Sequence, residues 1–172
     1  MTPTLASTPA LTVRAADAAD ADAINRIHNH YIRNTAITFE IEPWSAQRRA
    51  DWLRRFDAPY HALVAELDGA VAGFAYNTEF RNKAAYRRST ETTVYADAQT
   101  QSRGVGAALY QRLFELLAQH DFHRAFAAIS LPNPGSVAFH LRFGFAQVGV
   151  LSEVGHKFGR YIDTAWFEKA LD

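Results

Sequence analysis

The chain has 172 residues, and 48% of them are hydrophobic, which is enough to bury the core of one domain of ordinary size. Lysine plus arginine and aspartate plus glutamate number 18 each, so the chain lacks the net positive charge that draws proteins to nucleic acids or anionic membranes, and neither is an expected partner. The absence of cysteine excludes a disulfide framework, an iron–sulfur cluster and a catalytic thiol or acyl-cysteine intermediate.

The first ten residues include Thr, Ser and Pro and have little bulk, and they lack the basic and apolar regions of a secretory leader. We therefore expect residues 1–10 to form a flexible tail ahead of a single domain over residues 11–172. No apolar run is long enough to cross a bilayer, and the cytoplasm is the expected location.

The first part of the chain predicts a strand and two helices. Residues 11–14 form a short strand, and Asp17 is a residue type that caps helices. Apolar residues at helical spacing mark one face of the first helix: Ile24, Ile27 and Tyr31. A second helix is expected around residues 44–56. His28 and His30 are two positions apart on the first helix, so they point in nearly opposite directions and cannot bind one metal ion.

The middle of the chain predicts an antiparallel hairpin and a further strand. Residues 61–66 and 71–76 are rich in apolar residues and flank Asp68-Gly69, a dipeptide typical of two-residue hairpin turns. Residues 91–95 alternate with β-branched and aromatic side chains, which predicts a fourth strand that ends near Ala96.

The rest of the chain predicts a helix that continues to about residue 120, a fifth strand over residues 124–130, a short helix and two more strands. An antiparallel start followed by a strand–helix–strand unit favours an α/β (α+β) fold. We expect a mixed, mostly antiparallel central sheet of about six or seven strands with helices on both faces.

A glycine-rich turn over residues 101–108 joins the fourth strand to the helix that follows. Gly104 and Gly106 let the main chain approach a ligand closely, and the first turn of a helix has N–H groups without intrahelical partners. Together with the helix dipole and the charge of Arg103, these donors suit a pyrophosphate. A glycine turn that only starts a helix is the alternative interpretation.

Two common nucleotide-binding motifs do not fit this turn. A P-loop requires Gly-x-x-x-x-Gly-Lys followed by Ser or Thr, and a dinucleotide fingerprint requires Gly-x-Gly-x-x-Gly. Here Gly104-Val105-Gly106 is followed by Ala107-Ala108-Leu109, and the turn does not lie in the first strand–helix unit of the chain.

The remaining pattern, Gln/Arg-x-x-Gly-x-Gly/Ala, resembles the acetyl-coenzyme A loop of the GCN5-related N-acetyltransferases. Residues 133–145 resemble the second half-site of that superfamily, an Asn before a short helix that ends in Gly-Phe. Most members carry a Tyr four residues before that Gly, where it can act as general acid to the departing thiolate. This chain has His140 at that position.

Further segments resemble the phosphinothricin acetyltransferase branch of the superfamily, and the match runs from about Val13 to the C-terminus. These segments are residues 27–31, 38–40, 84–86, 91–95 and 154–163.

The resemblance implies acetyl-coenzyme A as the cofactor, with coenzyme A as product and no metal. In the family the pyrophosphate lies over the glycine-rich loop, main-chain groups at the end of the fourth strand pair with the pantetheine arm, and the Asn contacts that arm. The matching positions are Val94, Tyr95, Ala96, Gln101, Ser102, Arg103, Gly104, Val105, Gly106, Ala107 and Asn133.

Acetyl transfer to an amine needs a base, a donor for the oxyanion and an acid for the departing sulfur. Strand alternation turns Glu91, Thr93 and Tyr95 to one face, and the resemblance makes Glu91 the candidate base, acting directly or through water. His140, whose unperturbed pKa is roughly 6.5, is the candidate acid or base. Tyr95 can share the acid role, and a strand amide near it is the candidate oxyanion donor. Without the resemblance, these residues read as a solvated carboxylate, an ordinary histidine and a packed aromatic ring.

Basic residues and a tyrosine precede Glu91. In the resembling branch this segment grips the acidic groups of a glutamate-like amino acid, and Arg81, Lys83 and Tyr86 are the matching positions. Cations beside Glu91 would also favour its carboxylate form. A solvated charged loop is the alternative interpretation.

The opposite wall of the substrate site is expected to include Phe39 and Glu40. Tyr161 stands where the branch usually has Trp, and Thr93 is bulkier than the Ser sometimes found there. The choice among phosphinothricin, methionine sulfoximine and methionine sulfone as substrate therefore stays open.

Two other functions remain as alternatives: a protein or peptide N-terminal acetyltransferase, and a non-catalytic module that binds acetyl-coenzyme A. The basic segment argues against the first, which would want an open and often acidic groove. The presence of both Glu91 and His140 argues against the second. The resemblance also implies a homodimer, with residues 154–163 near the contact.

Overall fold

The computed structural model describes residues 10–100 and 103–171, so nearly all of the predicted tail lies outside the described residues. Within them the chain forms a seven-stranded sheet in the order β1-β2-β3-β4-β5-β7-β6. The strands are β1 (Leu11–Ala15), β2 (Ala62–Leu67), β3 (Ala70–Glu79), β4 (Ser89–Ala96), β5 (Arg124–Ser130), β6 (Ala146–Lys157) and β7 (Arg160–Ala170). The helices are α1 (Ala21–Asn34), α2 (Ala46–Leu53), α3 (Val105–Leu117) and α4 (Pro134–Arg142), with 3₁₀ turns η1 (Ala18–Asp20) and η2 (Ala84–Tyr86).

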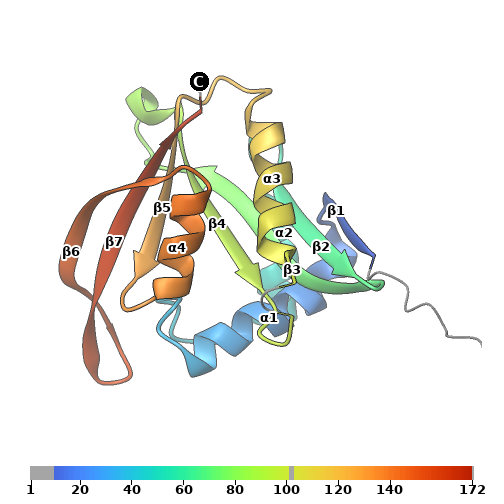
Figure 1. Cartoon of the computed structure of the whole chain (residues 1–172). Coiled ribbons are helices and arrows are strands. Elements are labelled where there is room, and N and C mark those ends of the chain that lie inside the picture. Colours follow the sequence, from blue (N-terminus) through green and yellow to red (C-terminus); the bar gives the residue numbers. More distant parts are fainter. Residues whose placement is uncertain (1–9, 101–102, 172) are drawn as a thin grey trace, which may run out of the picture.

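The sheet is mixed and mostly antiparallel, which confirms the predicted fold class. Among the described strands β4 and β5 run parallel, and the other neighbouring strands run antiparallel. β6 and β7 form a long hairpin at one edge of the sheet, and β1 is the other edge (Figure 1).

Helices cover both faces of the sheet: α3 and α4 lie on one face, and α1 and α2 on the other (Figure 1). Leu109 and Leu113 of α3 are fully buried in the first core, and Ile24 of α1 is fully buried in the second. Alternation along β2 supplies both cores, because Leu63 belongs to the α3 side and Val64 to the α1 side. The central strands of the sheet are therefore buried between two helical layers, whereas β6 at the edge is mostly exposed.

The β2–β3 hairpin has the predicted turn. Asp68 and Gly69 have φ values of 53° and 83°, as a type I′ turn requires of both central residues. Asp and Gly tolerate this left-handed conformation, so the local sequence determines the turn and the register of the two strands.

Helix ends differ from the predicted ones because capping, rather than apolar periodicity, determines them. α2 starts at Ala46 because the side-chain oxygen of Ser45 accepts a hydrogen bond from the backbone N–H of Arg48 at 3.2 Å. α3 ends at Leu117, a little before the predicted residue 120. Asp17 caps η1 rather than α1 itself. None of the helices in the described residues combines the length and apolarity that spanning a membrane requires.

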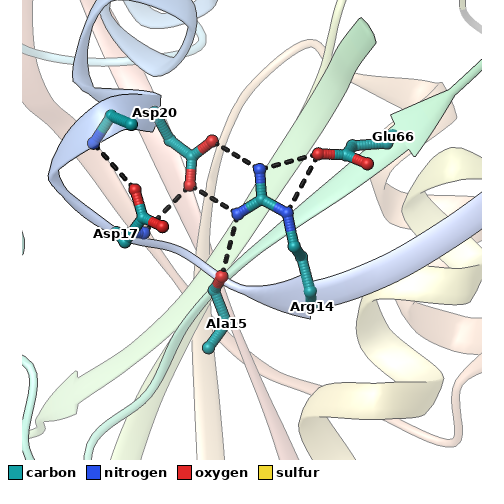
Figure 2. A network of polar contacts seen from close by, with 6 residues as sticks. Arg14, Ala15, Asp17, Asp20 and Glu66 are labelled. Carbon is teal, nitrogen blue, oxygen red and sulfur yellow. Dashed lines mark hydrogen bonds and ion pairs between the residues drawn. The ribbon is translucent and has the colours of Figure 1, made fainter. Parts of the chain in front are cut away.

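A network of ion pairs joins β1, β2 and η1 (Figure 2). The guanidinium of Arg14 donates to both carboxylate oxygens of Asp20, at 2.7 and 2.8 Å, and to Oε1 of Glu66, at 2.7 and 2.9 Å. Asp20 also accepts from the backbone N–H of Asp17 at 2.9 Å. Burial alone would raise the pKa of Asp20, but the hydrogen bonds from Arg14 and Asp17 outweigh it and lower that pKa.

The parallel pair β4–β5 is short, and this creates the space for a site. Residues Ser89–Glu91 pair with Arg124–Phe126, and the pairing ends there. Figure 1 shows the two strands diverging beyond that point. On its other side β4 stays paired with β3 up to Ala96. The second half of β4 therefore has one edge in the sheet and one edge facing an opening.

Candidate active site

A groove of about 590 Å³ lies at the end of β4 and the start of α3. Its lining includes eight of the predicted cofactor residues: Val94, Tyr95, Ala96, Gly104, Val105, Gly106, Ala107 and Asn133. Two further predicted residues, Gln101 and Ser102, lie outside the described residues. The groove is thus formed by the strand end and the glycine-rich turn, which are close in sequence, together with α4 from a later part of the chain.

The backbone at the start of α3 is shaped for an anion. Gly104 is the N-cap residue and has φ of 82°, a left-handed conformation that favours glycine. The first turn of α3 has no acidic side chain, and its N–H groups have no acceptors within the helix. A Cβ at Gly106 would lie 3.4 Å from the ring of Phe139, so glycine lets α4 pack closely against the start of α3. This end of α3 can donate hydrogen bonds to a phosphate.

Arg103 lies beside the groove but is not one of its lining residues. Its Nη2 is 3.9 Å from Oδ2 of Asp68, and both side chains are exposed. Arg142, in the last turn of α4, does line the groove. Among these two arginines, Arg142 is the one whose position adds a cation to the groove wall.

A second cavity, of about 60 Å³, occupies the opening between the diverging strands. Its lining combines residues 92–95 of β4 with residues 127–130 of β5, and includes Tyr110 and His140. Five residues line both this cavity and the groove: Ile37, Val94, Tyr95, Asn133 and Ser136. The cavity and the groove therefore share a wall, and a ligand in the groove can extend into the sheet.

Asn133 holds the start of α4 at the edge of both cavities. It is the N-cap residue, and its Oδ1 accepts from the backbone N–H of Ser136 at 3.2 Å, while Pro134 occupies the first helical position. Capping uses the side-chain oxygen, so the amide nitrogen is the part of Asn133 that can donate to a ligand.

His140 is buried, at 4% exposure, on the inner face of α4. Its Nδ1 is 2.8 Å from the carbonyl oxygen of Ser136, and its Nε2 is 3.0 Å from the hydroxyl of Tyr110. The ring packs edge-on against Tyr110 and Phe145. Burial lowers the pKa of His140, although the hydrogen bond to Ser136 partly opposes this. The neutral imidazole is therefore the favoured form near neutral pH.

Glu91 lies on the other face of β4, near the start of the strand. It is half-buried, and burial raises the pKa of its carboxyl, while the charge of Arg81 partly opposes that rise. Glu91 lines neither cavity. The structure thus separates the two candidate acid–base groups, Glu91 on the α1 side of the sheet and His140 on the α3 side.

Tyr95 packs against the core on the α1 side of the sheet. The ring packs against His28, Tyr31 and Phe74, with centroid distances of 5.2, 5.3 and 5.2 Å. Burial raises the pKa of its phenol, so the hydroxyl stays protonated at neutral pH. As a residue of the open half of β4, Tyr95 also lines both cavities.

The predicted substrate segment lies beside Glu91. The guanidinium of Arg81 lies over the rings of Phe80 and Trp166, at 4.6 and 5.6 Å, and Tyr86 meets the edge of Phe80 at 5.8 Å. Arg81 and Tyr86 are thus held around one aromatic ring, close enough to Glu91 for the charge of Arg81 to act on its pKa. Lys83 is exposed at the start of η2.

Phe39, which was predicted for the opposite wall of the substrate site, lies in the connection between α1 and α2 and lines neither cavity. Its half-exposed ring packs on Gly155 of β6. Nζ of Lys157, also on β6, donates to the carbonyl oxygen of Thr38 at 2.8 Å. Tyr161 on β7 is 67% exposed. The β6–β7 hairpin therefore contacts the α1–α2 connection through Gly155 and Lys157 of β6.

The two histidines of α1 face opposite directions, as predicted. His28 is buried and accepts a hydrogen bond at Nδ1 from the guanidinium of Arg49 at 2.6 Å, whereas His30 is exposed. Burial, and then the charge of Arg49, lower the pKa of His28 to about 3. Arg49 itself is buried between the rings of Trp44 and Trp52. Within residues 10–100 and 103–171, no three His, Cys, Asp or Glu side chains gather as metal ligands.

Several residues that line the two cavities were not predicted from the sequence. They are Tyr31, Ile37, Thr92, Thr100, Tyr110, Phe139 and Arg142. Most of them are apolar or helical residues whose periodicity marks them as core. Tyr110 had one available signal, since a hydroxyl within an otherwise apolar buried helix face requires a partner.

A parallel strand pair that opens beside a glycine-capped helix can hold an extended ligand with an anionic end. Residues 13–166 match the family model described as "Acetyltransferase (GNAT) domain". This protein therefore belongs to the GNAT acetyltransferase family and is an N-acetyltransferase.

Several proteins with assigned activities are similar to this chain over most of its length. The chain is 44% identical to a phosphinothricin N-acetyltransferase of Streptomyces coelicolor over 88% of its length and 91% of the relative. It is 32% identical to an L-methionine sulfoximine/L-methionine sulfone acetyltransferase of Salmonella typhimurium over 94% of its length and 95% of the relative. A phosphinothricin acetyltransferase from Sinorhizobium meliloti, solved in complex with acetyl-CoA, superposes with a TM-score of 0.88 at 33% identity, covering 93% of this chain and 88% of that one.

Proposed function

We propose that this protein acetylates the α-amine of a small amino acid analogue related to glutamate or methionine: phosphinothricin, methionine sulfoximine or methionine sulfone. The observation that carries this proposal is the shared wall of the groove and the small cavity between β4 and β5. A cofactor in the groove would present its acyl end within the sheet. The names of the relatives supply the substrate class.

Acetyl-CoA supplies an activated carbonyl and a thiolate leaving group when it is bound. We assign its pyrophosphate to the first turn of α3 and to the turn that includes Gln101, Ser102 and Arg103. Main-chain groups of residues 94–96 face the opening and would pair with the pantetheine arm, and Asn133 would donate to it. A strand amide near Tyr95 would stabilise the oxyanion, as main-chain donors do in other acyl transfers.

Two protons leave the amine nitrogen when an ammonium ion becomes an amide, and the structure offers a separate group for each. Glu91, whose pKa is raised by burial, is the group proposed to take the first proton and make the amine nucleophilic. His140 lines the cavity between the strands and is proposed to handle the second, which ends on the departing sulfur. The protonated phenol of Tyr95 is the alternative donor to sulfur.

Acceptor recognition is assigned to the surface around Glu91. Arg81 and Lys83 would attract the acidic groups of the substrate, and Tyr86 would hydrogen-bond to them. Phe39 would pack on the carbon chain from the opposite wall. Binding of these acidic groups would also fix the position of the substrate amine beside the thioester. Such positioning can raise the effective concentration of the amine by several orders of magnitude.

A homodimer through β6 is proposed as the assembly. β6 lies at the sheet edge, where an exposed apolar strand is prone to pair with another chain. Its exposed apolar side chains are Val148, Val150, Leu151 and Val154, at 44–55% exposure. Sedimentation velocity of the protein and of a Val150→Asp, Val154→Asp variant tests this: we expect a dimer and a monomer, respectively, and a monomeric wild type would contradict the proposal.

The activity test is thiol release from acetyl-CoA with a panel of amines. Because the chain has no cysteine, a thiol-reactive dye reports only coenzyme A. The panel contains phosphinothricin, methionine sulfoximine, methionine sulfone, glutamate, and peptides with Ala or Ser at the N-terminus. We expect turnover on one or more of the three analogues. Turnover on peptides alone would establish an N-terminal acetyltransferase instead, and cofactor binding without any transfer would establish a non-catalytic module.

A further inference from the structure

Tyr110 connects α3, α4 and β4 inside the sheet opening. It is fully buried, and its hydroxyl lies 3.0 Å from Nε2 of His140 and 3.3 Å from Oγ1 of Thr92. Thr92 in turn donates to the carbonyl oxygen of Phe126 on β5 at 3.3 Å. All three side chains belong to residues that line the cavity between the strands. A continuous set of polar contacts therefore runs from α4 to the two diverging strands.

The partners of His140 determine where its hydrogen lies. The carbonyl oxygen of Ser136 can only accept, so Nδ1, at 2.8 Å from it, carries the hydrogen. In the neutral ring Nε2 then has a lone pair and no hydrogen. The hydroxyl of Tyr110 has one hydrogen, and we assign it to that lone pair because Nε2 is nearer, at 3.0 Å, than the alternative acceptor, Oγ1 of Thr92, at 3.3 Å.

We propose that Tyr110 is a proton-relay residue for acetyl transfer: its hydroxyl holds Nε2 of His140 as a proton acceptor and passes protons between that nitrogen and the reacting atoms. This inference rests on the proposed function of the site. It assigns a role to a residue of α3, and it changes the expected order of events at His140, which accepts a proton before it returns one.

The proton balance can be followed through these atoms. After the amine nitrogen bonds to the carbonyl carbon, it releases a proton to the Tyr110 oxygen, and Tyr110 passes its own hydroxyl proton to Nε2 of His140. The carbon–sulfur bond then breaks and leaves a thiolate. The imidazolium returns its proton to Tyr110, and Tyr110 protonates the sulfur. Tyr110 and His140 end in their starting forms, and the products are the amide and coenzyme A.

Packing is the competing explanation for Tyr110, because its ring is surrounded by Phe114, Phe139, Phe143 and Phe145. Tyr110→Phe keeps the ring and removes only the hydroxyl, so it separates the two roles. Tyr60→Phe is the matched control, because Tyr60 packs against the same core but lines neither cavity.

The first measurement is nitrogen NMR of histidine-labelled protein, with His140→Gln used to assign the signal. We expect the wild-type ring to carry its hydrogen on Nδ1. We expect Tyr110→Phe to raise the pKa of His140, since the lost hydrogen bond favoured the neutral ring. Tyr60→Phe should leave that pKa unchanged. A wild-type ring with its hydrogen on Nε2 would overturn the inference without any need for a variant.

The second measurement is steady-state kinetics over a range of pH. Tyr110→Phe should lower kcat by roughly 10- to 100-fold, the lower part of the range for general acid–base catalysis, with the KM for acetyl-CoA nearly unchanged. Unchanged kcat and pH profile would reduce Tyr110 to a packing residue. Because the NMR result does not depend on turnover, a wild type that acetylates no amine refutes the proposed function, and an Nε2-protonated His140 refutes this inference.

Discussion

The ring of Phe39 fills the space directly above Gly155. A Cβ built on Gly155 would overlap three carbons of that ring, so the α1–α2 connection and β6 can approach only because this residue has no side chain.

Gly155→Ala should therefore displace Phe39 and the acceptor wall. We expect the free energy of unfolding to fall by about 1–3 kcal/mol, as in other overpacked sites, and the KM for the acceptor amine to rise while the KM for acetyl-CoA stays constant. Gly149→Ala on the same strand is the control, because a Cβ there meets no atom within 4 Å. Equal kinetics in the two variants would remove Phe39 from the acceptor site.

Gly104→Val should weaken coenzyme A binding. The left-handed backbone at φ of 82° disfavours a β-branched side chain, and the shift needed to relieve it would misplace the N–H groups of α3. We expect the dissociation constant for coenzyme A, measured by calorimetry, to rise roughly tenfold, a change of about 1.4 kcal/mol. Gly159→Val has the same type of backbone strain, at φ of 71°, but lies in the β6–β7 turn and should leave that constant unchanged.

Glu91→Gln should lower kcat by roughly 10²-fold and spare coenzyme A affinity, because Glu91 lines neither cavity. A base works only when ionised, so the raised pKa of Glu91 places the acid-side loss of activity at a higher pH than for an ordinary carboxyl.

The charge of Arg81 opposes that rise, so Arg81→Met should move the acid-side loss of activity to still higher pH. Arg87→Met, which removes an exposed charge from the same segment, should move it less. Identical pH profiles for the wild type and both variants would show that Glu91 does not limit the rate at low pH.

Asp20→Asn should lower the free energy of unfolding by about 2 kcal/mol at pH 7, because Asp20 accepts charge-assisted hydrogen bonds from Arg14 (Figure 2). The pKa of Asp20 is lowered in the folded state. Its contribution is therefore complete above its unfolded pKa, near 4, and disappears as the pH falls through the lower folded value.

Denaturant unfolding of wild type and Asp20→Asn at a series of pH values checks this, with the exposed Asp22→Asn as control. A stability difference that stays constant as the pH is lowered to the end of the acid range in which the protein folds would contradict the assigned role of Arg14.

Much of the fold was predictable because local chemistry determines it. Asp68-Gly69 specifies its hairpin, and the alternation of residues 91–95 specifies β4, whatever the rest of the chain does. The groove was predictable as well, because glycines before a helix determine where backbone donors are exposed. Helix ends were less accurate, since a single cap such as Ser45 determines them.

The contacts between α3, α4 and β4 could not be predicted in the same way. Periodicity marks Tyr110 as a core residue of α3, and only the three-dimensional arrangement brings its hydroxyl to His140 and Thr92. Likewise, Arg103 was predicted from its place in a motif, but Arg142 reaches the groove wall through the packing of α4. Contacts between distant segments depend on tertiary packing, which one sequence does not display.

The early end of the β4–β5 ladder has a mechanical consequence. Three residue pairs form the ladder between the two halves of the sheet, so without ligand the sheet should open locally there more readily than between its other neighbouring strands. A pantetheine arm that supplied the missing ladder bonds would stabilise the second half of β4 against local opening. Amide hydrogen exchange in the second half of β4 and in β5 should then slow when coenzyme A is added, which would make the donor substrate a temporary part of the fold.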